Sequence, residues 1–117
     1  MEDVVMHEHD VVVIGAGGAG LRAAIEASAA GVSVAMICKS MLGKAHTVMA
    51  EGGAAAALAN KDHRDSWQTH FRDTMTGGKY LGAWRMAQIH AQQAPDRIRE
   101  LEQGGAGFDR QSKGLTH

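Results

Sequence analysis

A continuous apolar run from Val11 to Ile14 is the first clear pattern in the chain. Such a run is typical of a parallel β-strand that is covered on both faces. After a glycine-rich stretch, a helical spacing of small and apolar residues predicts a helix with one face toward a sheet: Leu21, Ala24, Ile25 and Ser28. Gly31 is well placed to end this helix, and residues 32–38 supply a second strand. Residues 10–38 therefore predict a strand–helix–strand (βαβ) unit.

A helical segment is predicted further along, over residues 65–104. Its first part has five residues at the spacing of one helical face: Trp67, His70, Phe71, Thr74 and Met75. We expect His70 to be a packed core residue with its hydrogen bonds satisfied. The glycine pair at 77–78 predicts the end of this helix. Residues 84–93 predict a second helix, and Pro95 is expected to begin a third over residues 96–103, because proline is favoured in the first turn.

Three glycines between the first strand and the first helix have the spacing G-x-G-x-x-G: Gly15, Gly17 and Gly20. The first allows a tight turn, the second lets a pyrophosphate approach the backbone, and the third lets helix and strand pack closely. Because the motif follows a strand, opens a helix and lies in a unit of about 30 residues, it predicts a dinucleotide site. The second strand ends in Cys38-Lys39-Ser40 and not in the acidic residue that normally holds the adenosine ribose, which disfavours an NAD-dependent dehydrogenase.

Composition and charge exclude several other classes. The net charge of −1 gives no electrostatic case for nucleic acid binding. A single cysteine excludes an internal disulfide framework and is typical of a reducing compartment. The sequence shows no signal peptide, and no run approaches the roughly 20 apolar residues of a transmembrane helix. His7 and His9 have no third ligand nearby, so we expect a solvated lead-in and no metal site.

Residues 39–53 follow neither the helical nor the strand period, and we expect a long irregular loop that lines a ligand. The loop contains Lys44-Ala45-His46-Thr47 and then Glu51-Gly52-Gly53. Together with the glycine turn, it resembles the flavin-attachment loop of the succinate dehydrogenase and fumarate reductase flavoprotein subunits. Lys44 replaces the usual arginine and keeps its positive charge, whereas Ala45 replaces the usual serine and loses a hydroxyl.

The resemblance implies an α/β fold, a doubly wound (Rossmann-like) FAD-binding sheet of which residues 1–117 are the N-terminal part. It implies that His46 is bonded covalently to the 8α-methyl of FAD. Lys39-Ser40 also matches this family, in which the ribose carboxylate is commonly absent. The cofactor-binding residues implied by the resemblance are Gly15, Ala16, Gly17, Gly18, Ala19, Gly20, Cys38, Lys39, Ser40, Lys44, Ala45, His46, Thr47, Val48, Met49, Ala50, Glu51, Gly52 and Gly53.

The resemblance extends from about residue 9 to residue 110. It implies a short strand against the flavin at residues 54–59, although the propensity of alanine alone favours a helix there. Residues 111–117 do not continue the pattern. Intact members of the family are several times longer, so we expect the chain to be truncated relative to them. Their capping domain and catalytic residues, including the arginine that transfers a proton, then lie outside it.

For the parent protein, the resemblance implies oxidation of succinate to fumarate, or the reverse, by hydride transfer to FAD. Electrons then pass through an iron–sulfur subunit to a quinone. The implied partners are this subunit, membrane anchor subunits and a dicarboxylate substrate, with a peripheral position on the cytoplasmic face of a bacterial membrane. Two alternatives stay open: an FAD-binding fragment without turnover, and a related oxidase such as L-aspartate oxidase. The L-aspartate oxidases lack the histidine that His46 matches.

Overall fold

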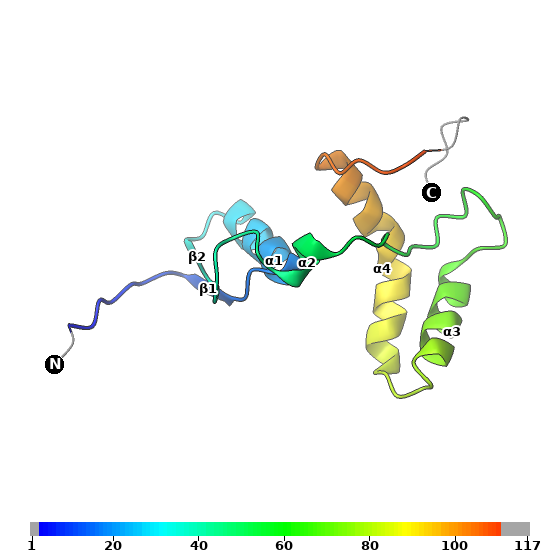
Figure 1. Cartoon of the computed structure of the whole chain (residues 1–117), viewed down its shortest axis with the longest axis horizontal. Coiled ribbons are helices and arrows are strands. Elements are labelled where there is room, and N and C mark those ends of the chain that lie inside the picture. The colour runs from blue at the N-terminus through cyan, green and yellow to red at the C-terminus, as the bar shows by residue number, and fades with distance from the viewer. Residues whose placement is uncertain (1–2, 111–117) are drawn as a thin grey trace. The chain divides into compact units, whose positions relative to one another are not determined.

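The structure is a computed structural model that describes residues 3–110. The chain divides into two compact units, one ending at Gly52 and the other beginning at Gly53. Along the chain (Figure 1), the elements are β1 (Val11–Ile14), α1 (Gly18–Ala29), β2 (Val34–Ile37), α2 (His46–Met49), α3 (Trp67–Gly77) and α4 (Trp84–Gln103). The first four belong to the first unit, and the two long helices α3 and α4 form the second.

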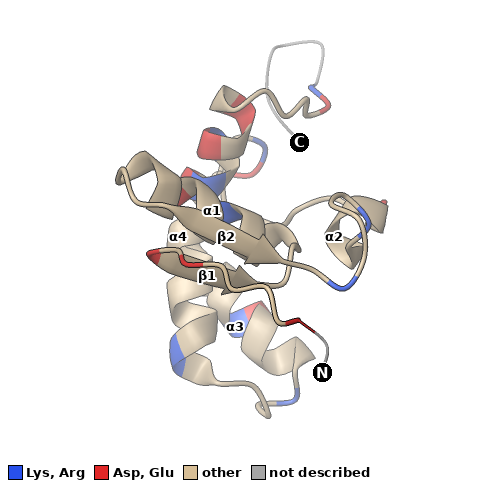
Figure 2. Cartoon of the chain, turned by 90° about the vertical axis from the view of Figure 1, so that its left-hand side faces the viewer, with Lys and Arg blue, Asp and Glu red and all other residues tan. Residues whose placement is uncertain are grey.

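The first unit begins with the predicted βαβ arrangement. β1 and β2 pair in parallel, with Val11 opposite Val34 and Ile14 opposite Ile37 (Figure 2). α1 connects them, and Gly31 follows it with a φ of 82°, a conformation that suits the residue after a helix. The second strand is shorter than the predicted 32–38. The prediction of a strand–helix–strand start is therefore confirmed, with the second strand trimmed at both ends.

Two glycines of the turn have clear structural reasons to be glycine. Gly15 has a φ of 108°, which residues with a side chain rarely adopt. A Cβ on Gly20 would lie 1.8 Å from the carbonyl oxygen of Gly15, far inside contact distance. Helix α1 therefore lies against the end of β1 so closely that only glycine fits. This confirms the packing role that the motif predicts for its third glycine.

Three hydrogen bonds between Asp10 and Ser33 fix the start of the sheet. The Asp10 carboxylate accepts the backbone N–H of Ser33 and the Ser33 hydroxyl, both at 2.8 Å, and the Asp10 N–H donates to Ser33 Oγ at 2.9 Å. The bond from the Ser33 N–H is the main reason that the pKa of Asp10 lies below its usual value. This Asp10–Ser33 clip uses the Ser33 N–H just before β2 begins at Val34.

We expect Asp10→Ala to cause a small decrease in thermal stability at pH 7, because the variant loses the clip. Since folding lowers the pKa of Asp10, its ionised carboxylate stabilises the fold above the unfolded value of 3.8. That contribution is lost as the pH falls through the lower folded pKa. Melting temperatures of wild type and variant should therefore differ most above pH 5 and converge in acid. A difference that grows on acidification contradicts this assignment.

The predicted packing face of α1 is covered only in part. Leu21 and Ala24 are half-buried, whereas Ser28 is exposed and Ile25 keeps 63% of its surface accessible. These residues line a shallow groove beside Val34 and Met36 of β2. The helical spacing predicted the side of α1 that faces the two-stranded sheet of its own unit, and that sheet covers it in part.

The second unit is a hairpin in which α3 and α4 pack against each other (Figure 1). Ala91 is fully buried and Ala94 is almost so, which lets the helices approach closely. The prediction that Pro95 starts a separate helix is wrong, because α4 runs unbroken from Trp84 to Gln103 with Pro95 inside it. Proline removes a single backbone N–H. Ala91 and Ala94 are buried in the turn just before Pro95, and their packing favours a continuous helix.

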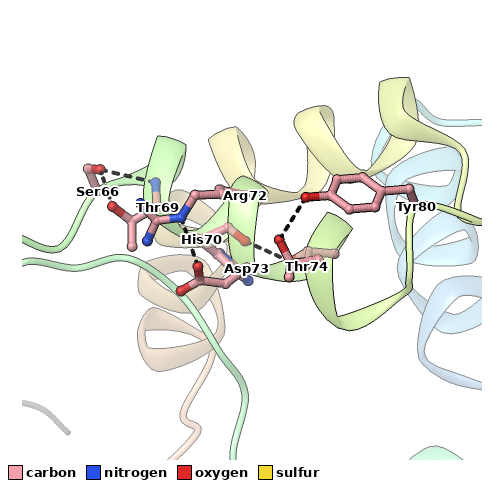
Figure 3. A network of polar contacts seen from close by, with 8 residues as sticks. Ser66, Thr69, His70, Arg72, Asp73, Thr74 and Tyr80 are labelled. Atoms are coloured by element: carbon pink, nitrogen blue, oxygen red, sulfur yellow. Dashed lines mark hydrogen bonds and ion pairs between the residues drawn. The ribbon is translucent and has the colours of Figure 1, made fainter.

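Polar side chains fix the ends of α3 (Figure 3). The Ser66 hydroxyl caps its start by accepting the N–H of Thr69 at 3.2 Å. Near its end, the Thr74 hydroxyl donates to the carbonyl of His70 at 2.8 Å. The His70 ring packs edge-on against His90 of α4, with centroids 5.5 Å apart, and its buried Nδ1 has no partner among the described residues. His70 thus packs as predicted, but its hydrogen bonds are not all satisfied.

The predicted strand at residues 54–59 is wrong for the described structure, which has neither strand nor helix there. The segment turns on itself, since the Leu58 N–H donates to the carbonyl of Ala56, and Ala59 takes a positive φ of 54°. A strand needs a neighbouring strand to bind its backbone groups. Among residues 3–110 the only sheet is the pair β1–β2, so residues 54–59 have no sheet partner in their own unit.

Candidate functional site

A hollow of about 530 Å³ lies where both strands of the first unit end. On one side it is lined by the end of β1 and the glycine turn, and on the other by the end of β2 and the loop that follows it. In open parallel sheets, ligands bind at the carboxyl ends of the strands. The hollow therefore lies where this fold class places a ligand. The lining residues are Ile14, Gly15, Ala16, Gly17, Ile37, Cys38, Lys39, Ser40, Met41, Lys44, Ala45 and His46.

The structure brings two sequence motifs together at this hollow. The glycine turn and the loop residues up to His46 share its lining, although they lie some thirty positions apart. Other predicted site residues of the first unit do not line it: Gly18, Ala19, Gly20, Thr47, Val48, Met49, Ala50, Glu51 and Gly52. Gly53 belongs to the second unit.

Sequence reasoning missed three lining residues, Ile14, Ile37 and Met41. The first two are the last residues of β1 and β2, so the rule that ligands bind at strand ends could have found them. Met41 gives no comparable signal. These side chains are 83%, 55% and 73% exposed in the order given, and they form an apolar wall beside the glycine turn.

The sequence predicted an irregular loop over residues 39–53, and the structure corrects this in part. It contains α2, a four-residue helix that begins at His46, with Ala45 as its N-cap residue. The Val48 N–H donates to the carbonyl of Ala45 at 3.1 Å. A helix this short has almost no stability of its own. Its conformation therefore depends on contacts with the rest of the first unit.

One such contact joins α2 to the glycine turn. The backbone N–H of Gly18, the first residue of α1, donates to Thr47 Oγ1 at 3.0 Å. The N-cap residue of α1 is Gly17, which has no side chain to accept such a bond. Thr47 thus satisfies one of the N–H groups that helix starts leave without an intrahelical acceptor.

The charges around the hollow favour an anion. Its lining contains Lys39, Lys44 and His46 but no aspartate or glutamate, and both lysines belong to the loop after β2. The start of α1 adds the positive end of a helix dipole beside the glycine turn. An FAD molecule needs an anion site for its pyrophosphate and an apolar surface for its rings. The residues present fit both requirements.

The rest of the described structure offers no comparable site. A hollow of about 470 Å³ in the second unit is lined mostly by charged residues, of which Asp62 and Arg64 form an exposed ion pair at 2.8 Å. The Arg64 side chain holds the pKa of Asp62 below its usual value, as expected for an ordinary ion pair on the surface. Residues 3–110 contain no group of three side chains placed to hold a metal ion. In the same range, no helix is long and apolar enough to cross a membrane.

Comparison with known proteins identifies the family. Residues 10–117 match the model of the FAD binding domain. The chain is 48% identical over 111 residues to one of the subunits of the fumarate reductase (CoM/CoB) of Methanothermobacter marburgensis, covering 94% of this chain and 20% of that protein. It is 47% identical over 114 residues to a mitochondrial succinate dehydrogenase flavoprotein subunit of Xenopus laevis, covering 97% and 17%.

Solved structures agree with these matches. A chain of the Mycobacterium smegmatis Sdh1 complex in the apo form is 66% identical, with a TM-score of 0.87 over 92% of this chain and 18% of that one. A quinol fumarate reductase chain from E. coli is 39% identical, with a TM-score of 0.83 over 93% and 18%. The chain spans about a fifth of the length of these relatives. It therefore belongs to the FAD binding domain family, and the resemblance to the flavoprotein subunits of succinate dehydrogenases and fumarate reductases is confirmed.

Proposed function

We propose that the chain is the FAD-binding start of a flavoprotein subunit that interconverts succinate and fumarate, with FAD attached covalently to His46. One observation carries the proposal: the glycine turn and the His46 loop meet at a single hollow, lined by cations and apolar side chains and free of carboxylates. Each motif alone is common. Their convergence at the carboxyl ends of two parallel strands is what a tethered dinucleotide requires.

In this proposal, different residues bind different parts of FAD. Gly17 lets the pyrophosphate approach the backbone at the start of α1, while Lys39 and Lys44 offset its charge. The exposed side chains of Ile14 and Met41 cover apolar ring surface. When bound, FAD supplies a two-electron acceptor for the hydride of the substrate. The attachment at His46 keeps the flavin from dissociating and tunes its electronics.

The remaining parts of the proposal concern the longer protein. The doubly wound sheet, the capping domain and the proton-transferring arginine lie in further sequence of the kind that the relatives have. Partners are membrane anchor subunits together with an iron–sulfur subunit, which place the protein peripherally on the cytoplasmic face of a bacterial membrane. The relative from Mycobacterium smegmatis, which supports this assignment, was solved as a complex.

The full-length flavoprotein, in its complex, should reduce an artificial dye when succinate is added, and malonate should inhibit this turnover. Residues 1–117 alone should show no such activity with added FAD, because the substrate-binding segments are proposed to lie elsewhere. A full-length protein that binds FAD but never turns over dicarboxylates contradicts the proposed reaction. Malonate-sensitive turnover by residues 1–117 contradicts the placement of the catalytic groups outside them.

A further inference from the structure

Thr47 touches the glycine turn through both branches of its side chain. Its hydroxyl accepts the N–H of Gly18 at 3.0 Å, across 29 positions of sequence. A Cβ built on Gly18 would lie 3.1 Å from Cγ2 of Thr47, and one on Gly17 would lie 3.6 Å from its Oγ1. The methyl group therefore packs against Gly18 at close range, and the hydroxyl caps α1 in place of the side chain that Gly17 lacks.

His46 lies next to this contact in the chain. His46 and Thr47 are adjacent in α2, a helix of four residues that is too short to hold its own conformation. The bond from Gly18 is a side-chain hydrogen bond that ties α2 to the βαβ unit. A change that releases Thr47 thus frees His46 to move relative to the glycine turn.

We propose that Thr47 is a positioning residue for covalent flavin attachment, which holds His46 at the distance from the glycine turn that a turn-bound FAD requires. The inference rests on the proposed function. In the attachment, His46 loses the proton of one ring nitrogen and forms a bond from that nitrogen to the 8α carbon, whose C–H bond breaks. When bound, the ring system of the same FAD would take up the two electrons and the two protons, so this bond formation would need no outside oxidant. Because such a step depends on geometry, small displacements slow it.

The test uses the full-length flavoprotein and separates the hydroxyl from the methyl. Thr47→Val keeps the shape and removes the hydrogen bond, and we expect it to slow covalent attachment roughly three- to tenfold, the effect of losing one hydrogen bond. Thr47→Ser keeps the hydroxyl and should attach flavin at the wild-type rate. Thr74→Val is the matched control, because it removes a hydroxyl that donates within α3, in the other unit. The readouts are flavin fluorescence of the denatured protein, total FAD from absorbance, and thermal unfolding.

A second pair of variants tests the same contact from the other side. Gly18→Ala places a methyl group 3.1 Å from Cγ2 of Thr47, so it should displace Thr47 and slow attachment. Thr47→Ser removes that Cγ2. The double variant Gly18→Ala with Thr47→Ser should therefore attach flavin faster than Gly18→Ala alone. This rescue keeps the proposal testable even if Thr47→Val does not fold.

The measurements separate a positioning role of Thr47 from the covalent attachment at His46. Slower attachment per bound FAD in Thr47→Val, with recovery in Thr47→Ser and in the double variant, supports the positioning role. If Thr47→Val lowers total FAD and thermal stability but not the attached fraction of bound FAD, Thr47 is only structural and the inference is wrong. The absence of rescue in the double variant overturns it as well. Wild-type protein without any covalent flavin refutes the proposed function at His46 itself.

Discussion

Full-length flavoprotein carrying His46→Ser should retain no flavin after denaturation, whereas the wild-type protein should show a fluorescent band on a denaturing gel. His46 begins α2 and is exposed at the hollow where the glycine turn and the loop meet. Serine lacks the ring nitrogen that forms the bond, so the covalent fraction should fall to zero. The proposed pyrophosphate site at the start of α1 is unchanged, and the native variant should therefore still bind FAD reversibly.

His63→Ser is the matched control for this experiment. His63 is exposed in the loop before α3, in the second unit, and it lines no part of the hollow. The control should keep the full fluorescent band. A covalent band that persists in His46→Ser shows that another residue carries the flavin. A native variant that binds no FAD at all shows that His46 supports the fold of the site as well as the attachment.

Gly20→Ala should destabilise the βαβ unit severely, by about 3 kcal/mol or more, which is the upper range for forcing an extra methyl group into a packed site. The added Cβ would lie 1.8 Å from the backbone oxygen of Gly15. A backbone atom cannot turn aside as a flexible side chain can, so α1 would have to move away from β1. We expect a low yield of FAD-loaded protein and an early transition in denaturant unfolding.

Gly82→Ala is the control for the alanine substitution itself, because a Cβ at that position meets no atom within 4 Å. Its unfolding transition should lie close to that of the wild type. Gly17→Ala makes a sharper comparison, since its Cβ meets only Thr47 Oγ1 at an ordinary 3.6 Å. That variant should fold normally and lose FAD affinity. Wild-type stability in Gly20→Ala would show that the helix shifts at little cost and that the third glycine is not required for packing.

Local patterns in the sequence predicted three of the four elements of the first unit, all but α2, and a dinucleotide as the kind of ligand. The apolar run at Val11–Ile14, the glycine spacing and the helical repeat after it are short-range signals, and the structure has β1, α1 and β2 in that order. Parallel pairing followed from the strand–helix–strand order. The same motifs placed Gly15–Gly17 and Lys44–His46 at one site, since both follow strand ends.

The sequence predictions were wrong where contacts between distant residues, or the lack of a neighbouring strand, decide the secondary structure. Proline favours a helix start, yet α4 passes through Pro95, where Ala91 and Ala94 pack into the hairpin with α3. The alanine-rich residues 54–59 were expected to form a strand, but no sheet edge of their own unit lies beside them.

The sequence by itself determined the βαβ start and its glycine turn, because each is encoded in neighbouring residues, and its resemblance to a known family implied the histidine that is proposed to carry the flavin. Tertiary structure alone decided that Asp10 binds Ser33, 23 positions away, and that Thr47 caps α1 at Gly18, 29 positions away. A hydroxyl or a carboxylate can accept a hydrogen bond from any N–H that the fold brings within reach, so its partner has no local sequence signature. The folded backbone determines which N–H lies within reach.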